Sequence, residues 1–195
     1  ALTAVSSGDT LIGGLGNDTM SSGGDSDAFV VDAGDDSIAG LNANDFVYVA
    51  PGATLEASVA SGGWQADADS RNDGAASVDV NGASFVKLAD VTAGFGWNLF
   101  NSGARAVYYQ GSALNDTLTA GAHGDNILGF SGSDSMIGGD GNDTMLGQAD
   151  ADTFVVQGGS DSIADLGLGA DDVIVMDGGN LVALAASSWT ADSHT

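Results

Sequence analysis

Residues 138–146 have the sequence Gly-Gly-Asp-Gly-Asn-Asp-Thr-Met-Leu. This stretch fits the nonapeptide pattern G-G-x-G-x-D-x-U-x, in which U is a large apolar residue. Residues 13–21, Gly-Gly-Leu-Gly-Asn-Asp-Thr-Met-Ser, form a second full copy. One match could arise by chance in a chain with 31 glycines, but the flanking residues continue the same spacing in both places. The pattern therefore marks a repeat, and this repeat decides the fold.

Aspartate recurs every nine residues around both copies, and an apolar residue follows each aspartate two positions later. The pairs of the first stretch are Asp9 and Leu11, Asp18 and Met20, Asp27 and Phe29, Asp36 and Ile38, and Asp45 and Val47. Those of the second are Asp116 and Leu118, Asp125 and Ile127, Asp134 and Met136, Asp143 and Met145, Asp152 and Phe154, and Asp161 and Ile163, with Asp172 and Ile174 after a two-residue insertion. Scattered acidic residues would not fall on this grid eleven times. The apolar partners are predicted to form a core.

Each nonapeptide predicts a turn followed by a short strand. Glycines in the turn permit positive φ and let the backbone approach an ion closely, and the central residue of x-U-x points inward. Two turns and two strands would complete a coil of roughly eighteen residues, so alternate turns stack on one edge. Each aspartate would face the aspartate of the next coil across a slot lined by carbonyls. Such an all-oxygen cage suits Ca²⁺ better than Mg²⁺.

These residues resemble the RTX (hemolysin-type) calcium-binding repeat family over about half of the chain. The resemblance implies an all-β fold, namely a right-handed parallel β-roll or β-solenoid, with several calcium ions in its turns. It also implies export by a type I secretion system. Two turns depart from the family pattern: residues 31–36 lack the paired glycines, and His123 takes the place of the third motif glycine in residues 120–125.

The predicted metal ligands are the sixth-position carboxylates and the carbonyl oxygens of the glycines in the two full copies. They are Asp9, Gly13, Gly14, Gly16, Asp18, Asp27, Asp36, Asp45, Asp116, Asp125, Asp134, Gly138, Gly139, Gly141, Asp143, Asp152, Asp161 and Asp172. Pairing grid aspartates eighteen apart gives seven candidate sites, four of them in the second stretch. Asp25, Asp35 and Asp140 lie off the grid and are interpreted as raising the local negative potential.

The chain has 27 acidic and 3 basic residues, for a net charge of −24. This charge opposes compaction and argues against nucleic acid as a partner. Without cations the Gly- and Asp-rich repeats are expected to stay disordered, so metal binding and folding should be one event. The chain has no cysteine, which excludes a disulfide framework. It also lacks an apolar run long enough for a membrane span and a basic signal-peptide region at residues 1–4.

We expect four segments: a repeat block at residues 1–49, a β-rich insert at 50–111, a second repeat block at 112–176, and the start of a second insert at 177–195. In the first insert, residues 76–80 alternate like a half-buried strand. Asn81-Gly82 signals a hairpin, with 85–88 as its return strand. Residues 96–103 and 106–109 predict two further strands. No segment favours a helix.

A longer repeat of about 125 residues relates the two halves of the chain. At this shift Asp18 matches Asp143, and Trp64 matches Trp189. Self-similarity at two periods is typical of a solenoid with punctuating modules. We therefore expect the chain to be part of a tandem array. Its recurring aromatic residues suit core packing better than a ligand-binding surface.

The sequence contains no convincing catalytic motif. H-E-x-x-H is absent, and residues 129–133 and 24–26, which resemble hydrolase motifs, both fall on repeat turns. His123 and His194 have no companion at a zinc-like spacing.

The predicted function is therefore non-enzymatic. It is a calcium-binding structural or adhesive segment of a bacterial secreted or cell-surface protein, such as a surface-layer protein or adhesin, that folds on calcium after export. The candidate partners are copies of itself or other cell-surface and matrix components. The alternative is a non-catalytic RTX secretion and folding region of an exported protease, lipase or epimerase. A third hypothesis, that the insert binds a carbohydrate, is compatible with the first.

Overall fold

The computed structural model describes residues 1–6, 8–24, 26–81 and 83–185, and these residues form three β-sheets and no helix. The long sheet contains, in spatial order, β1 (Leu2–Thr3), β3 (Thr19–Ser21), β5 (Asp35–Leu41), β7 (Thr54–Val59), β10 (Ala75–Asp79), β12 (Asn98–Phe100), β14 (Thr117–Thr119), β16 (Ser135–Ile137), β18 (Thr153–Val156) and β20 (Val173–Met176). The seven-stranded sheet contains β8 (Trp64–Gln65), β11 (Phe85–Lys87), β13 (Tyr108–Gln110), β15 (Asn126–Phe130), β17 (Thr144–Gln148), β19 (Ser160–Leu166) and β21 (Asn180–Ala185). The four-stranded sheet contains β2 (Thr10–Ile12), β4 (Ala28–Val31), β6 (Phe46–Val49) and β9 (Arg71–Asn72).

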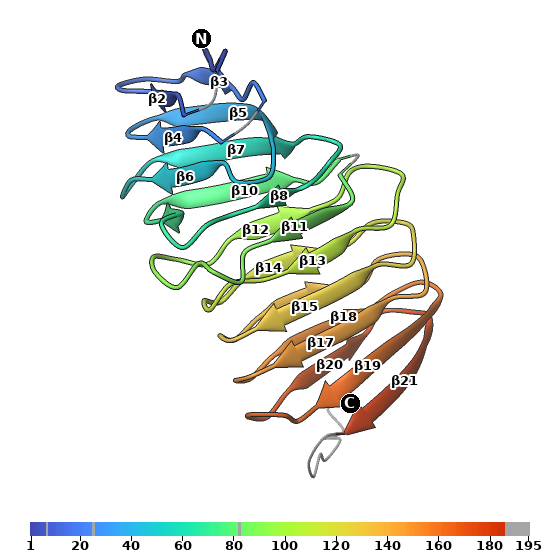
Figure 1. Ribbon diagram of the computed structural model, residues 1–195. Coiled ribbons are helices and arrows are strands. Elements are labelled where there is room, and N and C mark those ends of the chain that lie inside the picture. Colours follow the sequence, from blue (N-terminus) through green and yellow to red (C-terminus); the bar gives the residue numbers. More distant parts are fainter. Residues whose placement is uncertain (7, 25, 82, 186–195) are drawn as a thin grey trace.

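The strands stack in parallel from one end of the molecule to the other, as Figure 1 shows. In the repeat blocks, paired residues lie 18 positions apart, as in Leu11 with Phe29 and Met136 with Phe154, until the two-residue insertion, after which Phe154 pairs with Ile174, 20 positions later. Successive strands alternate between the long sheet and the sheet opposite it. The predicted coil of two turns and two strands is confirmed, and the fold is an all-β parallel solenoid consistent with a β-roll.

The grid explains the core of both blocks. In each x-U-x strand the central side chain points inward and its neighbours point outward. All eleven apolar grid residues are buried, namely Leu11, Met20, Phe29, Ile38, Val47, Leu118, Ile127, Met136, Met145, Phe154 and Ile163. The prediction that these residues form the core is confirmed.

Residues 50–111 continue the stack with wider coils. Along the long sheet, Ala57 pairs with Val78, and Val78 pairs with Leu99, each 21 residues apart. Within one of these coils the chain contributes β8 to the seven-stranded sheet and β9 to the four-stranded sheet. The insert is therefore where the wall opposite the long sheet changes from one sheet to the other.

Aromatic side chains fill the wider coils. The rings of Trp64 and Trp97 are buried and meet edge to face, with centroids 5.6 Å apart. Trp64 Nε1 donates a hydrogen bond to the carbonyl of Asp45 at 3.0 Å, and the buried Tyr109 donates its hydroxyl to the carbonyl of Thr119 at 3.1 Å. These three aromatic residues belong to the core, as expected.

The predicted hairpin at Asn81-Gly82 is wrong. β10 pairs with strands of the long sheet, whereas β11 pairs with β8 and β13 of the seven-stranded sheet. Val80 and Ala83 beside this turn are fully buried, so the chain rounds a corner of the core instead of reversing in one sheet. Gly82 itself, like Asp25, Trp189 and His194, lies outside the described residues.

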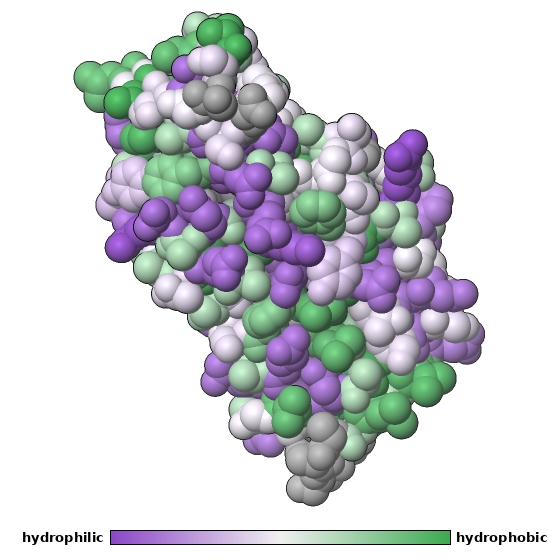
Figure 2. Space-filling model, viewed as in Figure 1, coloured by the Kyte–Doolittle hydropathy of each residue, from purple (hydrophilic) through white to green (hydrophobic). Residues whose placement is uncertain are grey.

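The two ends of the solenoid expose apolar side chains. Val5 and Leu15 are exposed near the N-terminus, as are Val173, Val182 and Leu184 near the C-terminus. Figure 2 shows hydrophobic residues gathered towards both ends of this face and polar residues across its middle. Among the described residues, no helix is long and apolar enough to cross a membrane.

We predict that Trp97→Ala lowers the free energy of unfolding by about 3–5 kcal/mol, because it leaves a cavity in the wide coils. Urea unfolding in saturating calcium measures this change. Phe95→Ala is the matched control, since Phe95 is 63% exposed and its truncation should cost less than about 0.5 kcal/mol. Equal losses from the two variants would contradict the core assignment.

Candidate metal centre

The aspartates of the grid form two ladders of hydrogen bonds, one along each edge of the solenoid. In each rung, Oδ1 of one aspartate accepts the backbone N–H of the aspartate 18 residues earlier. The structure contains all seven expected pairs at 2.8–3.1 Å: Asp9 with Asp27, Asp18 with Asp36, Asp27 with Asp45, Asp116 with Asp134, Asp125 with Asp143, Asp134 with Asp152, and Asp143 with Asp161. An eighth rung joins Asp152 to Asp172 at 3.0 Å, across the two-residue insertion.

The turns stack closely because glycine leaves room for the neighbouring backbone. A Cβ at Gly34 would overlap the carbonyl oxygen of Gly16, and one at Gly159 would overlap that of Gly141. Both glycines also have positive φ, of 100° and 81°. The carbonyls of Gly16 and Gly141 therefore face the next turn, where a bound ion could use them.

The remaining predicted glycine ligands lie in varied surroundings. The Cβ positions of Gly13 and Gly138 lie 2.5 and 2.7 Å from Oδ2 of Asp36 and Asp143. The Gly139 carbonyl accepts the N–H of Gly158 at 2.9 Å, and a Cβ at Gly14 would meet open space.

Six ladder aspartates carry an oxygen without a hydrogen-bond partner. Within the described residues, Oδ2 is buried and unpartnered in Asp27, Asp36, Asp134, Asp143, Asp152 and Asp161. A buried carboxylate oxygen is costly unless a donor or a cation meets it. The donor set of one carboxylate with nearby backbone carbonyls matches the hard oxygen ligands of Ca²⁺. The residues present therefore fit calcium.

Burial dominates the electrostatics of these turns. It raises the pKa of Asp134 to about 8, and neighbouring carboxylates add to the rise. The pKa values of Asp143 and Asp152 rise to about 7 for the same reasons. A divalent cation between these carboxylates would favour their ionised forms and remove the repulsion.

Within the described residues, side chains alone do not form a metal site. No group of three or more His, Cys, Asp or Glu side chains that could hold a metal occurs in the described part of the chain. His123 is exposed, and residues 129–133 span the end of β15 and the turn that follows it. Backbone carbonyls, such as those of Gly16 and Gly141, are therefore candidate ligands beside the carboxylates.

The grid misses several residues that tie the turns together. Asp165 is buried, and its oxygens accept the N–H groups of Gly147 and Gln148 at 3.2 and 2.9 Å. It occupies the first motif position, where glycine stands in the full copies. At the fifth motif position, the amide oxygens of Asn17, Asn115 and Asn142 each accept a backbone N–H one coil later. In the sequence, the only indication of these hydrogen bonds is that asparagine occupies the fifth motif position.

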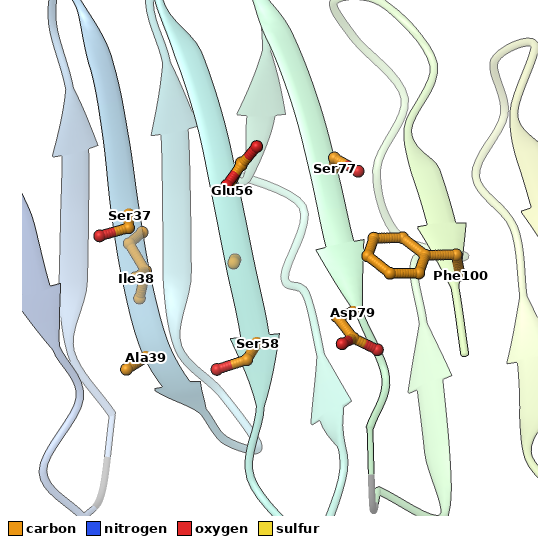
Figure 3. A pocket seen from close by; sticks show the side chains of 9 residues that line it. Ser37, Ile38, Ala39, Glu56, Ser58, Ser77, Asp79 and Phe100 are labelled. Carbon is orange, nitrogen blue, oxygen red and sulfur yellow. The ribbon is translucent and has the colours of Figure 1, made fainter. Parts of the chain in front are cut away.

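A groove of about 370 Å³ lies on the outer face of the long sheet. Figure 3 shows its lining side chains on neighbouring strands, among them Glu56, Ser58, Ser77, Asp79 and the Phe100 ring. Most of the polar groups serve the fold: Asp79 accepts the Ser102 hydroxyl at 2.6 Å, and Ser77 accepts the Asn98 amide at 3.1 Å. The groove therefore offers no arrangement comparable to the ladder.

Comparison with known families agrees with this geometry. A family model for the RTX calcium-binding nonapeptide repeat, in four copies, matches residues 6–29, 21–54 and 128–163. No curated protein and no solved structure matches the chain. The matched residues contain all six aspartates with an unpartnered Oδ2.

We predict opposite pH dependences with and without calcium. Asp134, Asp143 and Asp152 have folded pKa values above the usual 3.8, so their contribution to stability in chelator is present below about pH 4 and is lost as the pH rises through about 7–8. Calcium needs the ionised forms. Its affinity should therefore rise between about pH 6 and pH 8, by up to tenfold per unit for each displaced proton. Calcium titrations at pH 6 and pH 8 measure the change in affinity. An affinity that does not depend on pH would contradict the prediction.

Gly159→Ala should lower the free energy of unfolding by at least about 2 kcal/mol, because it adds strain at positive φ and an overlap with Gly141. Thermal or urea unfolding in calcium provides the measurement. Gly62→Ala is the control, since its Cβ would meet nothing within 4 Å. If the control proves as harmful as Gly159→Ala, close stacking of the turns is not the cause.

Proposed function

Because the repeat blocks of this chain belong to the RTX calcium-binding nonapeptide repeat family, we propose that it is a structural or adhesive segment of a bacterial secreted or cell-surface protein. In this proposal the chain folds on calcium after export. The ligands are the predicted sixth-position carboxylates and the carbonyls of the motif glycines. The repeat blocks are residues 1–49 and 112–176, separated by the insert at 50–111, with a second insert beginning at 177.

The observation that carries the proposal is the set of buried, unpartnered Oδ2 atoms along the ladders. A net charge of −24 leaves too few basic side chains to meet them. Arg71, one of three basic residues, is already paired with Asp73 at 2.6 Å. Either a proton or a cation from solution can therefore neutralise these carboxylates, and the nearby backbone carbonyls favour a cation.

Coupled binding and folding suits a protein that must leave the cell unfolded. The repeat blocks bury the one large apolar side chain of each nonapeptide and a few more, such as Val31 and Val156, which is a thin core for so much negative charge. Extracellular calcium modules bind at about 10⁻⁴–10⁻³ M, so the blocks would stay unfolded at low cytosolic calcium. RTX repeats are typical of secreted proteins, and a fold tied by calcium needs no disulfide.

A tandem arrangement is part of the same proposal. The pairing of β5 with β7 shifts register between Ile38 and Leu41, and the pairing of β19 with β21 shifts at the corresponding Ile163 and Leu166. This likeness supports the view that the insert begins again after the second block. Arrays of such modules suit stalks, surface layers and matrix proteins, with other copies or cell-surface components as partners.

The alternative is that the chain is a secretion and folding region of an exported enzyme. A simple run of repeats would suit that role, and the wide coils between the two blocks favour the structural role instead. Carbohydrate binding by the insert finds limited support, because Trp64 and Trp97 are buried and most polar groups of the outer groove are already hydrogen-bonded.

A calcium titration of the chelated chain, followed by far-UV circular dichroism, tests the proposal. The β signal should increase cooperatively at about 0.1–1 mM Ca²⁺. Mg²⁺ should produce little change, since it prefers a tight octahedron and retains its waters. An unchanged spectrum in calcium would refute calcium-driven folding.

Asp143→Asn should raise the calcium midpoint of this transition by about tenfold, because it removes the charge from a carboxylate with an unpartnered Oδ2. Asp90→Asn makes the same change of charge at an exposed position and should leave the midpoint nearly unchanged. Equal shifts would mean that net charge, and not a local site, controls the response.

A further inference from the structure

We propose that calcium binds this chain in two clusters, at Asp27 and Asp36 and at Asp134, Asp143, Asp152 and Asp161, and that protein donors replace the ion in the turns between them. The central segment, residues 45–125, then folds without calcium. This inference rests on the proposed function and specifies which of its predicted turns take an ion.

Asp45 and Asp116 lie at the two ends of the wide coils, and both oxygens of each carboxylate already accept hydrogen bonds. Oδ2 of Asp45 accepts the Ser22 hydroxyl and the Asn42 N–H, both at 2.9 Å. Asn42 also donates its side-chain amide to the Ser22 hydroxyl at 2.7 Å, which fixes the hydroxyl in place.

At Asp116 a serine again donates to Oδ2, but this serine lies only four residues away in the sequence. Its Oδ2 accepts the N–H and the hydroxyl of Ser112 at 2.6 and 2.8 Å, and its Oδ1 accepts the Trp97 N–H at 2.6 Å. Ser112 is fully buried. The serine hydroxyl therefore meets the oxygen that lacks a partner in the ladder turns of the blocks.

Both carboxylate oxygens of Asp125 accept hydrogen bonds from backbone N–H groups. Its oxygens accept the N–H groups of Val107 at 2.5 Å and Gly121 at 3.2 Å. This turn contains His123 in place of a motif glycine, so the departure from the family pattern coincides with a carboxylate that has its own donors.

In other turns of the wide coils, buried uncharged side chains make the hydrogen bonds that join neighbouring segments. The buried Ser70 hydroxyl accepts the Val47 N–H at 3.2 Å and donates to Asp67 at 3.2 Å. The buried Asn72 donates to the carbonyl of Gly96 at 2.8 Å and accepts the Gly74 N–H at 3.1 Å. No unpartnered buried carboxylate oxygen lies between residues 45 and 125 within the described chain.

The central segment also has the larger core. It contains two buried tryptophans and the buried Tyr109, together with Leu55, Val78, Val86, Leu88 and Leu99, all fully buried. Burial of such side chains can stabilise a segment of this size without a metal. The flanking blocks have fewer large side chains per residue and hold all six unpartnered oxygens.

Hydrogen–deuterium exchange of the full chain, in chelator and in calcium, tests the assignment. We expect amides of β7, β10 and β12 to stay protected in chelator, while those of β16 to β19 exchange at least about tenfold faster than in calcium. If the centre loses its protection together with the blocks, the inference is wrong although calcium-driven folding stands. If calcium changes protection nowhere, the proposed function itself fails.

Two variants separate the two kinds of turn. Ser112→Ala should reduce protection of the wide coils in chelator, and Ser61→Ala, at an exposed position in the same segment, should not. Asp143→Asn should reduce protection of β15 to β19 in calcium and leave the centre unchanged in either medium. Native mass spectrometry should then show fewer bound ions for Asp143→Asn and the wild-type number for Ser112→Ala. A lost ion in Ser112→Ala would place calcium at Asp116 and overturn the assignment.

Discussion

The structure depends on one contact repeated along each edge, in which a buried carboxylate accepts the backbone N–H of the aspartate one coil earlier. This contact holds successive coils together: the carboxylate and the amide lie 18 residues apart in seven rungs and 20 residues apart in the rung across the insertion. It also draws negative charge into the interior of the turns, where each further coil adds another carboxylate. The same interaction that aligns the coils therefore creates the need for a cation.

The chain meets this need in two ways, and the choice follows from local sequence. Glycine in the first motif position leaves space beside Oδ2 at Gly138 and Gly147, where no donor enters it, and also at Gly111 beside Asp116. Ser22 and Ser112 bring a hydroxyl to the equivalent oxygen of Asp45 and Asp116. Since coils contact only their neighbours, stability in such a solenoid is approximately a sum of local terms. A centre held by its own donors and aromatic core can thus stay folded when the blocks on either side lack calcium.

The repeat could be predicted from sequence because its spacing encodes both the inward residues and the partners along the ladder. All seven aspartate pairs follow from counting eighteen residues, and the eleven apolar grid residues follow from the alternation within a strand. The wide coils carry no such spacing. Asn81-Gly82 predicted a hairpin from local turn chemistry, but burial of Val80 and Ala83 on the two sides of the turn decided the path.

The donors that replace an ion escaped prediction for a similar reason. Ser22 lies 23 residues from Asp45 in sequence, outside the nine-residue grid, and a serine in a turn carries no distinctive signal by itself. Asp165 was missed because it stands at a position that the pattern reserves for glycine. Its hydrogen bonds to Gly147 and Gln148 depend on the stacking of two coils. Such contacts become visible only when the coils are placed against each other.

The most direct test of the account is a crystal structure of the chain grown in calcium, with anomalous scattering used to locate the ions. If calcium binds at the unpartnered Oδ2 atoms, anomalous peaks will lie within about 2.3–2.6 Å of Oδ2 in the turns of Asp134 and Asp143, with no peak beside the Ser112 hydroxyl. The same fold without ions along the ladders, or with an ion between Ser112 and Asp116, would contradict it.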